Sequence, residues 1–181
     1  MESVFEKYGP SVEEWIEKHT DEMVRDLISL VNIRSVAEEG KDGYALGPGC
    51  AEVLDKALEL AASWGLDTEN DDYYCGSALF KGKTDREIAF VGHLDVVPEG
   101  EGWTYEPFDA VYKDGHVIGR GSNDNKGSCI AALYTARCFK ELGVELRHTV
   151  RVLMGCQEET GEMKDMIHFR RVHADPELCL V

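Results

Sequence analysis

Apolar residues recur along the chain at two spacings, and each spacing predicts one kind of element. Helical spacing predicts helices over residues 50–64, 126–142 and 164–171, and one helix or a helix pair over residues 12–31. Short apolar runs bounded by turn residues predict strands over residues 73–80, 87–91, 110–112, 116–118, 149–154 and 177–181. Polar turns separate the first two strands and the next two, so we predict hairpins at residues 81–85 and 113–115.

The order of these elements predicts an α/β fold. From residue 93 onward the chain reads as strand, hairpin, helix, strand, helix and strand, which is typical of a mainly parallel mixed sheet flanked by helices. A chain of 181 residues supports one well-buried domain, so we predict a single unit over residues 1–181 without a second domain. The chain stops inside the apolar run 178–181, and we expect it to be a fragment of a longer protein.

The composition is that of a globular protein with an acidic surface. Lysine and arginine number 19 against 35 aspartates and glutamates, which leaves a net charge of −16. Such a surface repels phosphate backbones and anionic membranes, so we expect neither nucleic acid nor membrane as a partner. The sequence shows no apolar run long enough to span a membrane, no secretory signal pattern and only scattered cysteines. We therefore expect a cytoplasmic protein with reduced thiols.

The first candidate chemical group follows the predicted strand at residues 87–91. Residues two apart in extended backbone point the same way, so His93 and Asp95 can face each other. A histidine that binds metal through one ring nitrogen needs its other N–H held, and a nearby carboxylate holds it well. Taken alone, the pattern fits an ordinary histidine at a strand end beside a solvated aspartate better than it fits a site.

Two acidic motifs occupy comparable positions. Glu158 and Glu159 follow the strand at residues 149–154, where neighbouring carboxylates repel each other unless a cation or proton lies between them. One of them could bind a metal while the other takes a proton from water. Asp124 follows the glycine-rich segment 119–121 and could bridge two cations. The simpler alternatives are a helix N-terminus for the glutamates and a helix N-cap for Asp124.

Together, these residues predict a metal centre. Ligands of open α/β sheets bind beyond the carboxyl ends of the strands, and the histidine and all the acidic motifs fall at this edge. Mixed nitrogen and oxygen ligands without cysteine suit Zn²⁺, with Mn²⁺ or Co²⁺ as possible substitutes. Coincidence is the weaker explanation of the whole set.

In sequence order, these motifs closely resemble a family of dinuclear metallopeptidases. The resemblance rests on residues 92–98 (GHLDVVP), 102–104 (GWT), 107–108 (PF), 119–127 (GRGSNDNKG) and 158–159 (EE). The family includes acetylornithine deacetylase, succinyl-diaminopimelate desuccinylase, aminoacylase and the carnosinase-like dipeptidases. The chain looks most like the bacterial dipeptidase branch, and the likeness runs from about Glu13 to the last residue.

The resemblance implies a role for each site residue. It implies that His93 binds one metal, that Glu159 binds the other and that Asp124 bridges both. Glu158 would be the general base acting on a water that bridges two zinc ions, and Asp95 would steady the His93 ring. The implied reaction is hydrolysis of the amide bond of dipeptides or similar small N-acyl amino acids.

The chain also departs from the family pattern. Family members are considerably longer and carry a second, lid-like domain. A further acidic ligand just beyond the last strand and a histidine ligand near the family C-terminus have no counterpart, so three of the usual five protein ligands are present. We therefore expect this polypeptide to bind metal weakly and to turn over little substrate by itself. The alternative is a catalytically inactive remnant or interaction module that retains the motifs.

Several residues near these motifs are predicted to be structural. Cys156 is expected to be a small buried thiol, and Lys126 is expected either to pair with a neighbouring acid or simply to begin its helix. Five histidines show no partner pattern, and we expect them at the surface: His19, His116, His148, His168 and His173.

Overall fold

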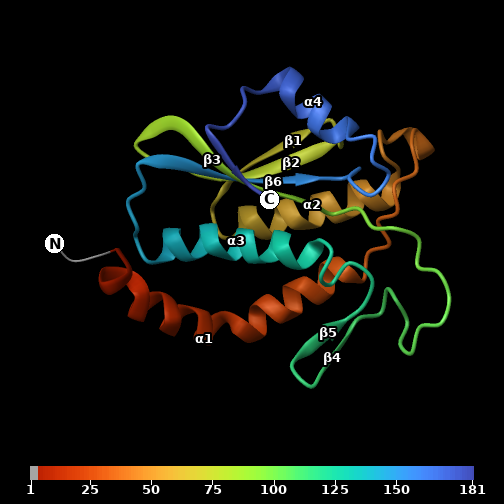
Figure 1. The fold of residues 1–181 in the computed structure, drawn as a ribbon, viewed down its shortest axis with the longest axis horizontal. Helices are drawn as coiled ribbons and strands as arrows, with labels where there is room; N and C mark the ends of the chain where they lie inside the picture. Colours follow the sequence, from red (N-terminus) through yellow and green to blue (C-terminus); the bar gives the residue numbers. More distant parts are fainter. Residues whose placement is uncertain (1–3) are drawn as a thin grey trace.

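A computed structural model describes residues 4–181 and shows a five-stranded mixed sheet with helices on both faces (Figure 1). The helices are α1 (Val4–Val31), α2 (Pro48–Ser63), α3 (Lys126–Glu141) and α4 (Lys164–Val172), with the short 3-10 helix η1 at Lys41–Gly43. The strands of the sheet are β1 (Asp67–Asp71), β2 (Cys75–Phe80), β3 (Thr84–His93), β6 (His148–Gly155) and β7 (Leu178–Leu180). A separate hairpin consists of β4 (Val111–Lys113) and β5 (His116–Ile118).

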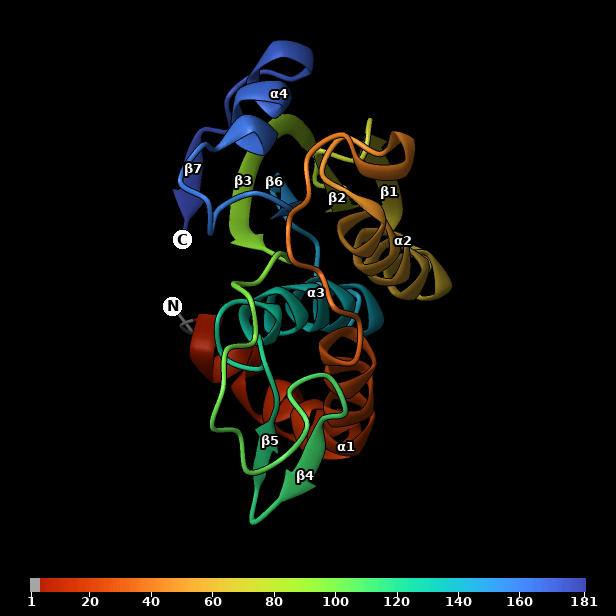
Figure 2. The ribbon, with the colours of Figure 1, turned by 90° about the vertical axis from the view of Figure 1, so that its right-hand side faces the viewer.

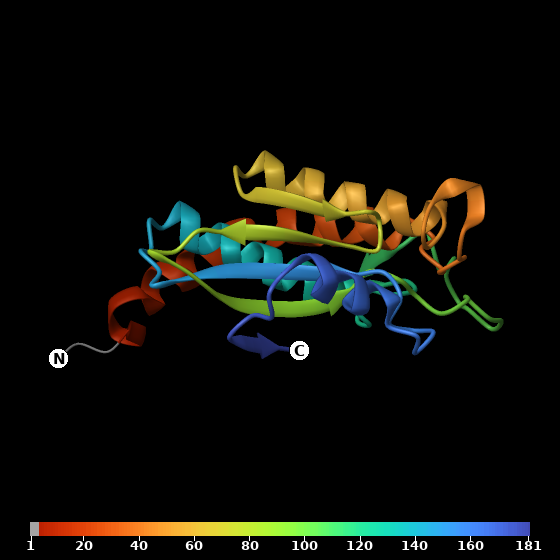
Figure 3. The same cartoon turned by 90° about the horizontal axis from the view of Figure 1, so that it is seen from above.

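The predicted α/β fold with a mixed sheet is confirmed. The strand order is β1-β2-β6-β3-β7, and the strands fan out in this order in Figure 3. Within residues 4–181, β3 pairs parallel with both β6 and β7, whereas β2 pairs antiparallel with both β1 and β6. The parallel pairs therefore lie on one side of the sheet and the antiparallel pairs on the other.

The predicted hairpin at residues 81–85 is wrong. β6 lies between β2 and β3, so the two strands flanking this turn are not neighbours. The hairpin partner of β2 is β1, whose sequence Asp-Thr-Glu-Asn-Asp has no apolar residue and so shows no strand-like hydrophobic pattern. The hairpin predicted at residues 113–115 is confirmed as β4–β5.

The helices form layers on the two faces of the sheet. α2 and α3 cover one face, α4 covers the other, and α1 packs outside α3 (Figures 1 and 2). The strand β6 is buried along nearly its whole length because both of its faces are covered. Val150, Val152 and Met154 join the core under α2 and α3, and Leu153 packs with Phe169 of α4. No helix in the described part of the chain is long and apolar enough to cross a bilayer.

Candidate metal centre

The carboxyl ends of β3 and β6 lie side by side and carry two of the predicted motifs. These strands are parallel neighbours, and their register places His93 opposite Gly155. The backbone N–H of Leu94 donates to the carbonyl oxygen of Gly155 over 2.8 Å, so the two segments leave the sheet together. Sequence order alone predicted this edge, and the pairing of β3 with β6 is its physical basis.

The third motif, on the segment before α3, reaches the same edge because β3 has a glycine where α3 approaches. A Cβ atom on Gly92 would lie 2.7 Å from the Asn125 side-chain oxygen and 2.8 Å from the Cys129 sulfur. Any larger residue would push the start of α3 away from the strand. The close approach places Asp124 directly over the end of β3.

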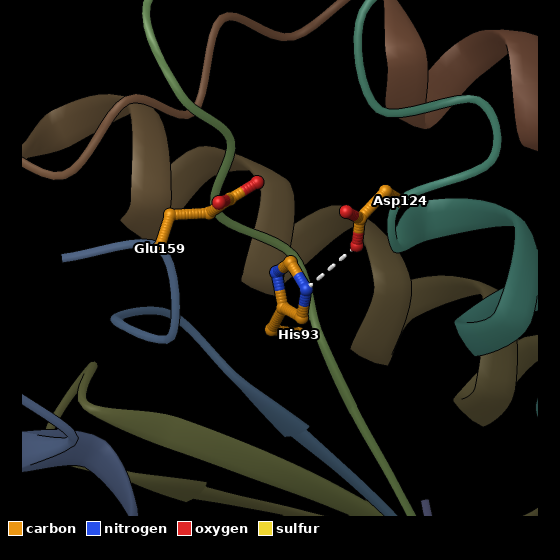
Figure 4. A group of neighbouring side chains, drawn as sticks. All are labelled: His93, Asp124 and Glu159. Atoms are coloured by element: carbon orange, nitrogen blue, oxygen red, sulfur yellow. Dashed lines mark hydrogen bonds and ion pairs between the residues drawn. The ribbon is translucent and has the colours of Figure 1, made fainter. Parts of the chain in front are cut away.

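The three predicted ligands come together at this edge. One ligand atom from each of His93, Asp124 and Glu159 lies within 4.8 Å of the other two, and Figure 4 shows the three side chains around a shared space. His93 Nε2 is 3.1 Å from Asp124 Oδ1 and 3.8 Å from Glu158 Oε2. His93 is buried, whereas the side chains of Asp124 and Glu158 are 71% and 51% exposed. The histidine therefore lies at the buried end of the site, and the carboxylates of Asp124 and Glu158 lie at its solvent-exposed end.

Asp95 contacts both sides of the site. Its carboxylate lies 3.4 Å from His93 Nδ1, and its backbone carbonyl oxygen lies 3.1 Å from the same atom. The predicted facing of His93 and Asp95 is therefore observed. The same buried carboxylate also accepts the backbone N–H groups of Glu158, over 3.2 Å, and of Glu159, over 3.0 Å. No pattern in the sequence predicted this second contact.

The electrostatics of the site favour a positive charge between its acidic groups. Burial alone would lower the pKa of His93, but the hydrogen bond and charge of Asp95, together with Glu158, raise the pKa to about 9. Burial raises the pKa of Glu159, and the neighbouring carboxylates of Asp124, Asp95 and Glu158 raise it further, against the opposing effect of His93. Either a proton or a metal cation on the ring side of these carboxylates relieves their repulsion.

The simpler structural alternatives for the acidic motifs do not hold. The residue that caps α3 is Asn125, and no side chain forms a capping hydrogen bond there, so Asp124 is not an N-cap. Glu158 and Glu159 lie in a turn well before α4, which begins at Lys164, so they do not belong to a helix N-terminus. The remaining donor set, one imidazole nitrogen with carboxylate oxygens, fits a zinc-type cation.

Lys126 has a role that the sequence did not reveal. It is fully buried, and its Nζ donates to the carbonyl oxygens of Leu30, over 2.9 Å, and Ile33, over 2.7 Å, where α1 ends. Burial lowers its pKa to about 8. Lys126 begins α3, as one of the two predicted alternatives stated, but its partners are backbone carbonyls of a segment far away in sequence.

Two further predictions about side chains have opposite outcomes. Cys156 is fully buried, and the neighbouring Cys50 side chain, together with burial, raises its pKa well above the usual value, as befits an inert thiol. His19 was predicted at the surface, and this is wrong. Its ring is buried and stacks on Trp15 with 4.1 Å between ring centroids, because α3 covers this side of α1.

Comparison with known proteins finds relatives that share the sequence and the fold of this chain. A β-Ala-Xaa dipeptidase of Lactobacillus delbrueckii subsp. lactis is 36% identical over 151 residues, which cover 82% of this chain and 32% of the relative. Human carnosine dipeptidase 1 has the same fold, with a TM-score of 0.72, 23% identity, and coverage of 86% of this chain and 36% of that structure. A dinuclear metal-binding peptidase of Bacillus subtilis superposes with a TM-score of 0.60 at 16% identity, over 87% of this chain and 41% of that one.

The matches cover most of this chain but only part of each relative. The chain spans about a third of the length of the curated relatives it matches. Residues 89–180, which contain every motif of the candidate metal centre, match the family model described as peptidase family M20/M25/M40. The resemblance seen in the sequence is confirmed, and the chain belongs to peptidase family M20/M25/M40.

Proposed function

We propose that this chain carries part of the active site of a metal-dependent hydrolase that cleaves the amide bond of dipeptides. The observation that carries the proposal is the convergence of His93, Asp124 and Glu159 from three separate segments to within 4.8 Å. Family membership and a relative named as a β-Ala-Xaa dipeptidase support the same reaction. Small N-acyl amino acids are the alternative substrates, since they contain the same type of bond.

The proposed cofactor is a pair of zinc ions, with Mn²⁺ or Co²⁺ as substitutes. His93 would hold one ion, Glu159 the other, and Asp124 would bridge them. When bound, such ions lower the pKa of water and polarise the carbonyl group of the substrate. The donor set supports this assignment, because it offers imidazole nitrogen and carboxylate oxygen without a thiol.

Glu158 is proposed as the general base. Its carboxylate is half exposed and lies 3.8 Å from His93 Nε2, so it reaches the water side of the ligand cluster. It would take the proton from the attacking water and later deliver it to the departing amine. Asp95 would orient the His93 ring through Nδ1 and fix the backbone of the glutamate pair.

The domain to which this chain belongs and its cellular compartment are also proposals. We propose that residues 1–181 form the N-terminal part of a catalytic domain, because the matched relatives extend well beyond the matched segment. The charge of −16 argues against nucleic acid and anionic membranes as partners, and we propose a cytoplasmic enzyme that acts on small peptides.

Dipeptide hydrolysis in the presence of Zn²⁺ or Mn²⁺ tests the proposal, on this chain and on any longer product of its reading frame. In the active form, Glu158→Gln should lower turnover about a thousandfold while metal content stays unchanged, because the variant loses a base and keeps the ligands. The control is Glu14→Gln, an exposed substitution on α1. Equal loss of metal in Glu158→Gln, or full activity, contradicts the proposed role. Competition between dipeptides and N-acyl amino acids then identifies the substrate class.

A further inference from the structure

The segment that carries the glutamate pair is held through its backbone by two buried carboxylates. The N–H of Gln157 donates to Asp165 over 2.8 Å. The next two N–H groups, those of Glu158 and Glu159, donate to the two oxygens of Asp95 over 3.2 Å and 3.0 Å. Three consecutive backbone donors therefore bind carboxylate oxygens, and such hydrogen bonds are stronger than those to neutral acceptors.

Asp165 occupies an unusual place for a carboxylate. It lies in the first turn of α4, is 1% exposed, and faces the end of β6 rather than solvent. A Cβ atom on Gly155 would lie 2.3 Å from Asp165 Oδ2, so the carboxylate occupies space that only a glycine leaves free. Its other oxygen accepts the N–H of Met166 over 2.7 Å. Burying a carboxylate is costly, and these backbone donors offset the cost.

The outer side of the same segment is fastened as well. The Gln157 side chain is buried, and its Nε2 donates to Glu39 over 2.6 Å and lies 3.4 Å from Glu162. Lys164 pairs with both of these acidic residues and so closes the cluster. The backbone just before the glutamate pair is therefore fixed from α4 and from the segment that precedes α2.

We propose that Asp165 is a positioning residue of the metal centre. With Asp95, it holds the backbone of residues 157–159 so that the carboxylates of Glu158 and Glu159 face His93 and Asp124. The inference rests on the proposed function, since it assigns Asp165 a task in that same site. Groups that orient metal ligands from behind affect metal affinity by about 10- to 100-fold, although they never touch the ion.

The test combines metal affinity with backbone dynamics. Asp165→Asn removes the negative charge and leaves a single acceptor oxygen for the amides that Asp165 now binds. Titration with Co²⁺, followed by its visible absorption, should show about tenfold weaker binding in this variant. In the metal-free protein, amide hydrogen exchange at Gln157, Glu158 and Glu159 should be faster than in the wild type.

The matched control, Asp71→Asn, weakens a contact at the C-terminal end of α4, away from Asp165. His173, just after α4, lies 2.9 Å from Asp71 of β1, so Asp71→Asn weakens the docking of α4 without touching residues 157–159. This control should lower thermal stability while Co²⁺ affinity and the three exchange rates stay unchanged. If Asp165→Asn does not fold, Gly155→Ala displaces the same carboxylate from the strand side and should give the same two effects.

The inference is overturned if Asp165→Asn binds Co²⁺ as tightly as the wild type with unchanged exchange at the three amides. It is also overturned if Asp71→Asn weakens Co²⁺ binding equally, because the effect would then belong to α4 as a whole. If the wild type shows no His93-dependent Co²⁺ binding, the proposed function fails. The exchange rates of the metal-free protein still decide whether Asp165 holds the segment.

Discussion

Two clusters of charged side chains lie on the same sheet and balance their charges differently. Under α4, the buried Arg151 of β6 binds the Glu87 carboxylate through Nε and Nη2, over 2.7 Å and 2.9 Å, and Glu69 through Nη1 over 2.7 Å. The guanidinium also lies over the ring of Phe169. This cluster has a permanent cation of its own at its centre.

Among residues 4–181, no lysine or arginine forms an ion pair with the carboxylates at the carboxyl ends of β3 and β6. In the described part of the chain, Asp95, Asp124 and Glu158 form their ion pairs with one ring, that of His93. Glu159 adds a fourth carboxylate, and its pKa is raised by burial and by its acidic neighbours. The Arg151 cluster therefore balances its carboxylates with a cation of the chain itself, whereas the proposed metal centre would balance the carboxylates around His93 with a bound cation.

Arg151→Met should have the largest effect on stability. The substitution leaves the Glu87 carboxylate, which is 21% exposed, without its partner and should lower the free energy of unfolding by about 3 kcal/mol. Urea denaturation measures the loss. Co²⁺ affinity should be unchanged, and a large drop in affinity would show that the two clusters are not independent.

Zinc should stabilise the chain through the His93 cluster. A ligand that binds the folded state alone adds about 2.7 kcal/mol when its concentration is a hundred times its Kd. Thermal unfolding with increasing Zn²⁺ should show this gain in the wild type and in Asp85→Ala, which alters an exposed acid at the other end of β3. Asp124→Ala should lose most of the gain, and an undiminished gain there would argue against Asp124 as a ligand.

The pH dependence of stability should reveal Lys126, a buried cation without an acidic hydrogen-bond partner. Its pKa is about 8 in the folded chain and 10.5 ordinarily, so the unfolded chain holds more protons between these values. Stability of the wild type relative to Lys126→Met should therefore rise with pH from about 8 to 10, by about 2 kcal/mol. Urea denaturation of both proteins across this range measures it, and a difference independent of pH would contradict the assignment.

An exposed ion pair should have the smallest effect on the free energy of unfolding. Arg170, in the last turn of α4, binds Asp175, just after the helix, over 2.9 Å, and both side chains are more than half exposed. Asp175→Asn should change the free energy of unfolding by less than about 0.5 kcal/mol, because solvent screens such pairs. A loss of stability comparable to that of Arg151→Met would mean that burial does not determine how much each ion pair contributes to stability.

The sequence predicted those parts of the fold and site that have a local pattern. The strand β6 and the helix α3 carry clear apolar spacings, and both were predicted within one or two residues of their bounds. The strand β1 has none, because its five residues are all polar and it lies at the edge of the sheet. The position of β6 between β2 and β3 depends on long-range packing, so the turn residues at 81–85 do not predict it.

The same division holds for the site. The order of the motifs predicted that His93, Asp124 and Glu159 fall at one edge, since His93 and Glu159 lie at or beyond strand ends and Asp124 directly precedes a helix. The contacts of Asp165 with Gln157 and of Lys126 with the end of α1 depend on how distant segments approach each other. The glycine at position 155 was the one sequence feature that could have pointed to a close approach there.

The most direct test of the central claim is anomalous X-ray diffraction at the zinc edge from crystals of the zinc-loaded chain. The structure predicts an anomalous peak in the space between His93 Nε2 and the carboxylates of Asp124 and Glu159. Zinc found at other histidines alone, with no peak at this position, would contradict the assignment of the metal centre.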